Sequence, residues 1–118
     1  PKEAADLIRL AGGKVVLAHP VAYKYEDNLT DDDILDIVRD MNIDAIESNY
    51  IYIDRNNNKI NECSLWNEFA KKNNLFTTIG SDFHNDDGIR PIIGLVNENL
   101  SISDEQINKI IEYLEINN

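Results

Sequence analysis

Short apolar runs alternate with amphipathic segments along this chain, and that alternation limits the folds it can adopt. Residues 14–18, 44–48, 75–79 and 92–96 have the apolar, β-branched character of buried strands. Helical patterns occupy residues 1–11, 30–42, 61–73 and the segment that follows Ser103. Strands that alternate with helices predict a parallel sheet with right-handed crossovers. We therefore expect an α/β fold with about four mostly parallel strands and four helices.

The helices and loops carry more specific expectations. Thr30 is a good N-cap, and the aspartates at 31–33 suit the positive end of a helix dipole better than they suit a metal patch. Asn42 is expected to end that helix in the left-handed conformation. We expect polar loops over residues 21–29 and 49–58. The apolar stripes expected to be buried in the first and last helices are Ala4, Leu7, Ile8 and Ala11, and Ile107, Ile110, Ile111 and Leu114.

Residues of metal-ligand type stand at the ends of these strands. His19 follows the first run, Glu47 lies near the end of the second, and Asp82 and His84 follow the third. Pro20 is expected to hold His19 in extended geometry. Asp82 and His84 would share one face of an extended backbone, with Phe83 on the other. Because the carboxyl ends of parallel strands meet at one edge, these four residues should be neighbours.

Imidazole nitrogens and carboxylate oxygens are ligands suited to Zn, Mn or Fe. A metal held there could lower the pKa of bound water and polarise a phosphoryl oxygen, which is the chemistry of metal-assisted hydrolysis. The chain has no Gly-rich phosphate loop and no Gly-x-Ser-x-Gly elbow, and Cys63 has no evident partner for thiol catalysis. Arg90 has two interpretations, a contact to a phosphoryl oxygen or a surface charge beside nearby aspartates.

The composition limits the classes of molecule that this chain could bind. The 118 residues suffice for one domain, and a formal charge of -11 opposes binding along a nucleic-acid backbone. A small phosphorylated substrate is not excluded, because metal ions can meet its charge. The single cysteine permits no intrachain disulfide. No apolar run approaches the ~20 residues that a membrane span needs. We expect a cytoplasmic protein with no membrane partner.

Three stretches resemble the PHP family, the polymerase-and-histidinol-phosphatase domain of metal-dependent phosphoesterases. They are residues 11–20 (AGGKVVLAHP), residues 44–47 (DAIE) and residues 80–84 (GSDFH), in the order and spacing of that family. The resemblance implies a (β/α) barrel with metals at its carboxyl face. It implies His19, Asp82 and His84 as metal ligands, with Asp82 and His84 catalytic. Arg90, a few residues farther on, would then be the candidate substrate contact. Glu47 would support a ligand without contacting the metal.

The chain departs from the family in one respect. The family begins with His-x-His and has further ligands in its first half, whereas this chain has two histidines, His19 and His84. We therefore expect residues 1–118 to be the carboxyl-terminal part of such a domain. The fold would be a partial (β/α) barrel-like layer, with an incomplete ligand shell for Mn, Zn or Fe. The isolated chain would hydrolyse phosphate mono- or diesters weakly or not at all.

Partner expectations follow from the same interpretation. In the parent enzyme the substrate would be a small phosphorylated molecule or a short oligonucleotide. The exposed strand edges and apolar faces of a partial domain could let the chain associate with itself. The alternative function is a noncatalytic acidic α/β domain that binds a protein partner.

Overall fold

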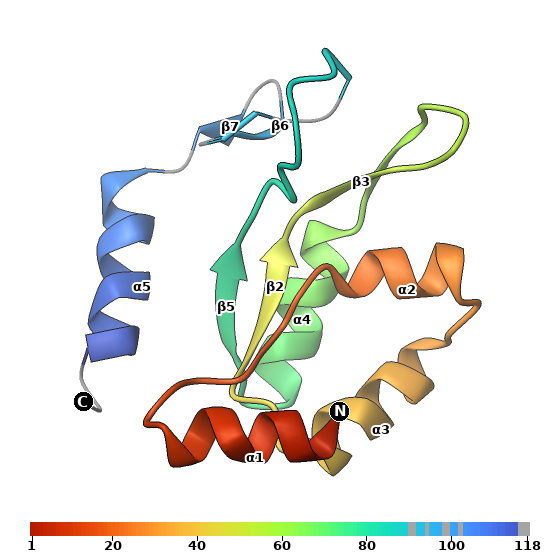
Figure 1. The fold of residues 1–118 in the computed structure, drawn as a ribbon. Helices are drawn as coiled ribbons and strands as arrows, with labels where there is room; N and C mark the ends of the chain where they lie inside the picture. The colour runs from red at the N-terminus through yellow and green to blue at the C-terminus, as the bar shows by residue number, and fades with distance from the viewer. Residues whose placement is uncertain (90–91, 94, 98–99, 102, 116–118) are drawn as a thin grey trace.

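The computed structural model describes residues 1–89, 92–93, 95–97, 100–101 and 103–115. These residues form helices and strands in a mixed order along the chain (Figure 1). The helices are α1 (Lys2–Leu10), α2 (Pro20–Glu26), α3 (Asp31–Asp40), α4 (Cys63–Lys72) and α5 (Asp104–Glu115). The strands are β1 (Val16–Leu17), β2 (Ala45–Asn49), β3 (Ile51–Ile53), β4 (Lys59–Asn61), β5 (Phe76–Ile79), β6 (Leu95–Asn97) and β7 (Leu100–Ser101).

Three strands form a parallel sheet in the order β1-β2-β5. Strands β2 and β5 lie side by side at the centre of the molecule (Figure 1). Strands β3 and β4 form an antiparallel hairpin beyond it, and β6 pairs antiparallel with β7. The α/β fold class is therefore confirmed. The strand expected over residues 92–96 lies at β6 instead and does not join the parallel sheet. The part of the chain that the structure describes contains no closed barrel.

The main core lies between the sheet and the helices that cover it. Leu17 of β1 is in register with Ile46 of β2, and both belong to one apolar cluster with Ile34 and Trp66. Trp66 of α4 is 1% exposed, and its Nε1–H donates to Oε2 of Glu62 at 3.1 Å. The indole is thus buried with its polar atom paired, as a core tryptophan requires.

Helix α3 begins and ends as its sequence predicts. The Thr30 side chain accepts the backbone N–H of Asp33 at 3.1 Å, and the Asp33 carboxylate accepts the backbone N–H of Thr30 at 2.8 Å. This reciprocal pair is a capping box, which satisfies N–H groups that a helix leaves unpaired. Asn42 follows the helix with φ 50°, the left-handed conformation expected of it.

Two segments expected to be loops are regular structure. Residues 21–29 largely form α2, because Pro20 at its first position presets the helical φ and needs no hydrogen-bond donor there. Residues 49–58 contain β3 and the turn of the β3–β4 hairpin. Within that turn the Asp54 carboxylate accepts the backbone N–H groups of Asn56 and Asn58, both at 2.8 Å. The strand is a short run of aromatic and β-branched residues, and the polar residues that follow it made the whole segment resemble a loop.

The outer helices bury less than their patterns predict. In α1 the buried residue is Ala5, whereas Leu7 is 66% exposed, and Ala4, Ile8 and Ala11 are exposed as well. No described side chain of α5 is buried. Its Tyr113 stacks on Phe76 of β5 with ring centroids 3.9 Å apart, while Ile107, Ile111 and Leu114 are exposed. Amphipathic periodicity predicted these helices correctly but could not show what covers their apolar faces.

Replacing Thr30 with alanine should destabilise the protein by about 1 kcal/mol, because the first turn of α3 then loses its side-chain cap. Urea unfolding of the Thr30→Ala variant measures this change. Thr30→Ser keeps the hydroxyl group and should stay close to the wild type. Equal stability of Thr30→Ala and wild type would contradict a role for this cap.

Candidate functional site

A hollow of about 240 Å³ lies beyond the carboxyl ends of the parallel strands. Three predicted site residues contribute to its wall: His19, which follows β1, and Asp82 and His84, which follow β5. The rest of the wall comes mainly from α2 and β3. The described residues that line it are His19, Ala22, Glu26, Tyr50, Ile51, Tyr52, Ile53, Ser81, Asp82 and His84. The fold therefore brings together side chains more than 60 positions apart in the sequence.

His19 occupies the turn from β1 into α2. It is the N-cap residue of α2, with φ 33° and ψ 60°, so the prediction of an extended His19 was wrong. Pro20 disfavours the right-handed helical conformation at the preceding residue, and the left-handed one lets the chain turn directly into the helix. A non-glycine residue in this region carries strain of order 1–3 kcal/mol. Neighbouring contacts must therefore hold His19 in place.

Two tyrosines flank the His19 ring. Its centroid lies 5.4 Å from that of Tyr23 on α2 and 5.8 Å from that of Tyr50, both in tilted geometry. The Nδ1 atom of His19 is buried and has no hydrogen-bond partner among the described residues. A buried polar atom without a partner is costly in free energy. A ligand that paired with it would therefore stabilise the site.

Glu47 of β2 supports His19 through the backbone rather than the ring. The His19 N–H donates to Oε2 of Glu47 at 2.8 Å. The same carboxylate lies against Gly80, where an added Cβ would be 2.7 Å from Cδ of Glu47 and closer still to Oε1. Glu47 does not contribute to the described wall of the hollow. Among the described residues it thus contacts His19 without lining the hollow itself.

Burial and nearby carboxylates together set the electrostatics of the site. Burial raises the pKa of Glu47, the His19 N–H and imidazole lower it, and the nearby Asp82 charge raises it further. Burial also raises the pKa of Tyr23, with further contributions from Asp27, Glu47 and Asp82. A hydrogen bond and several charges thus act on Glu47, and burial prevails.

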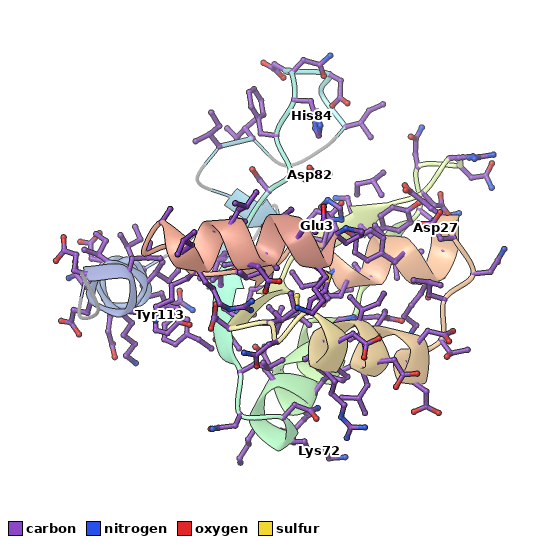
Figure 2. The ribbon with its side chains drawn as sticks, turned by 60° about the horizontal axis from the view of Figure 1, so that its bottom comes forward. Glu3, Asp27, Lys72, Asp82, His84 and Tyr113 are labelled. Carbon is purple, nitrogen blue, oxygen red and sulfur yellow. The ribbon has the colours of Figure 1, made fainter. Side chains whose placement is uncertain are left out.

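Asp82 and His84 lie on the segment beyond β5 in a compact turn. Asp82 has φ 52°, so the extended geometry predicted for this pair was wrong. Nδ1 of His84 is 2.7 Å from the backbone oxygen of Asp82 and 3.7 Å from its Oδ1. The Tyr50 hydroxyl donates to Oδ2 of Asp82 at 3.5 Å. Figure 2 shows His84 farther out than Asp82, in agreement with side-chain exposures of 66% and 32%.

The donor types fit a transition-metal ion, but their placement is incomplete. Two imidazoles and a carboxylate are suitable ligands, and all three side chains belong to residues that line the hollow. However, the described residues contain no group of three or more His, Cys, Asp or Glu side chains positioned to hold a metal ion. The described part of the chain therefore offers individual ligands without an assembled shell.

Sequence reasoning missed several residues of the site. Tyr23 and Tyr50 flank His19, the β3 residues wall the hollow, and Gly80 makes room for Glu47. The continuous run of aromatic and β-branched residues at 50–53 was the available signal for β3. Arg90, predicted as a phosphate contact, lies outside the described residues.

No family model, no curated protein and no solved structure matches this chain. Among the described helices none is both long and apolar enough to cross a membrane.

Because burial raises the pKa of Glu47 above the ordinary 4.5, the stability that this group contributes is complete below the unfolded pKa. It is lost as the pH rises through the folded pKa. Relative to Glu47→Gln, the wild type should thus lose stability as the pH rises across this interval, measured by urea unfolding at several pH values. Asp82→Asn should shift the Glu47 carboxyl titration, followed by NMR, to lower pH. If the stability of the wild type relative to Glu47→Gln instead increased with rising pH, this assignment would be contradicted.

Proposed function

We propose that this chain carries the later part of the metal site of a PHP-type phosphoesterase. The observation that supports the proposal most directly is that His19, Asp82 and His84, from the ends of two different strands, line one hollow. Metal and substrate sites of α/β proteins lie at this edge of a parallel sheet. In this proposal β1, β2 and β5 belong to a partial barrel-like layer, and further ligands come from residues that this chain lacks.

The charge of the hollow supports metal dependence. Glu26 and Asp82 line it, and none of its described lining residues is Lys or Arg. A phosphate ester would meet a negative environment, unless divalent cations supplied the opposing charge. When bound, such a metal would lower the pKa of a water molecule and polarise the phosphoryl group.

The residues of the chain have separate tasks in this proposal. His19 presents an imidazole that contacts the rings of Tyr23 and Tyr50. Asp82 presents a carboxylate that receives the Tyr50 hydroxyl, and His84 provides a second imidazole on the exposed side. The β3 side of the hollow, with Tyr52 and Ile53, would accommodate the part of the substrate that does not react.

Calorimetric titration with Mn²⁺ and with Zn²⁺ tests the metal site. The wild type should bind one of these ions, and His84→Ala should weaken binding by more than about tenfold, because even residues that only support a ligand often contribute that much. Asp86→Asn removes a carboxylate from the same exposed loop but outside the hollow, and should bind like the wild type. No heat of binding with either ion would contradict the proposal.

The isolated chain should hydrolyse a chromogenic phosphate ester poorly in the presence of Mn²⁺, because its described residues do not assemble a complete ligand shell. Initial rates with and without metal measure this activity. Brisk turnover that Asp82→Ala abolishes would show that the chain holds a complete site and would contradict this prediction.

A second candidate function is a noncatalytic acidic domain that binds a protein partner. It is favoured by apolar side chains at the surface, among which Leu10 is 84% exposed and Ile93 74% exposed. The calorimetric titration separates the two candidates. Binding that depends on His84 favours the phosphoesterase, and the absence of binding by every metal favours the partner-binding domain.

A further inference from the structure

Gly80 follows β5 and lies against the end of β2. Pairing of the two strands is irregular here: Glu47 is in register with Thr78 and Asn49 with Ile79, so one residue of β2 bulges between them. The Gly80 N–H then donates to the backbone carbonyl oxygen of Asn49 at 3.2 Å. This bond fixes the backbone of residue 80 beside the Glu47 carboxylate.

The backbone conformation of Gly80 does not require glycine. Its φ lies outside the left-handed range, in contrast to Gly12 and Gly88, whose φ angles are 85° and 71°. The constraint is the Glu47 side chain, whose Cδ would lie 2.7 Å from a Cβ at residue 80. The Glu47 carboxylate thus fills the space that a side chain at residue 80 would occupy.

The carboxylate in that space holds His19. It accepts the His19 N–H at 2.8 Å. The φ of His19 is 33°, which is unfavourable for any residue other than glycine. A hydrogen bond to a charged acceptor is stronger than one between neutral groups. It therefore stabilises the turn that orients the imidazole toward the hollow.

We propose that Gly80 and Glu47 are positioning residues for His19: the missing side chain of the one admits the carboxylate of the other, which fixes the His19 backbone. The ends of all three parallel strands are thereby coupled. The positioning itself is a property of the fold, and its consequence for metal binding rests on the function proposed above.

Gly80→Ala tests this coupling with little risk to folding. The added methyl group meets the end of a flexible side chain, so Glu47 should swing away instead of the backbone shifting. Hydrogen exchange of the His19 amide, followed by NMR, should then accelerate by about tenfold to a hundredfold, as expected for losing a hydrogen bond to a charged acceptor. Glu47→Ala should have the same effect.

The effects of Gly80→Ala and Glu47→Ala on exchange of the His19 amide should not be additive. In a Glu47→Ala background the space beside residue 80 is empty, so Gly80→Ala should cause no further acceleration. Gly12→Ala is the control: it strains a glycine with positive φ that has no atom near its Cβ position, and it lies away from Glu47. It should leave the relative protection of the His19 amide unchanged.

The outcomes separate this inference from the proposed function. Unchanged exchange at the His19 amide in Gly80→Ala, or fully additive effects in the double variant, would overturn the positioning role. If the amide responds as expected, the positioning role is supported whether or not the wild type binds Mn²⁺ or Zn²⁺. Where the wild type does bind, Gly80→Ala should weaken metal binding together with the loss of amide protection.

Discussion

Parallel pairing of β2 with a strand on each side is the constraint on which the rest of the structure depends. Ala45 and Ile46 of β2 are completely buried although consecutive side chains face opposite sides of the sheet, so both faces are covered at this point. Helix α4 packs against β2 and β5, and the apolar cluster that contains Ile46 also includes Ile34 and Trp66. With β2 fixed, the chain segments that leave β1 and β5 must emerge on the same edge, and the hollow forms there.

Much of this arrangement could be predicted from local signals. The runs that became β1, β2 and β5 are short, apolar and β-branched, and each is bounded by turn or polar residues. The Thr30 cap and the Asn42 stop are single-residue effects that need no tertiary information. Placing His19, Asp82 and His84 at one edge then required only the geometry of a parallel sheet.

The remainder depends on tertiary contacts that no local pattern contains. The left-handed residue His19 donates its N–H to an acceptor that lies 28 positions away, at Glu47. The requirement for glycine at residue 80 comes from a neighbouring side chain and not from its own backbone. Likewise, the exposed faces of α1 and α5 have ordinary amphipathic patterns, and periodicity does not reveal that the described residues leave them uncovered.

The location of the single tryptophan has a practical consequence. Trp66 is buried in α4 against Phe69, whereas the aromatic rings around His19 are tyrosines. Selective excitation of the indole therefore reports on the core at α4. Tyrosine absorbance is weighted toward α2 and β3, because four of the five tyrosines lie on or beside those two elements. The indole shares one apolar cluster with Tyr50 and Tyr52, so its emission should also respond to rearrangements that reach the wall of the hollow.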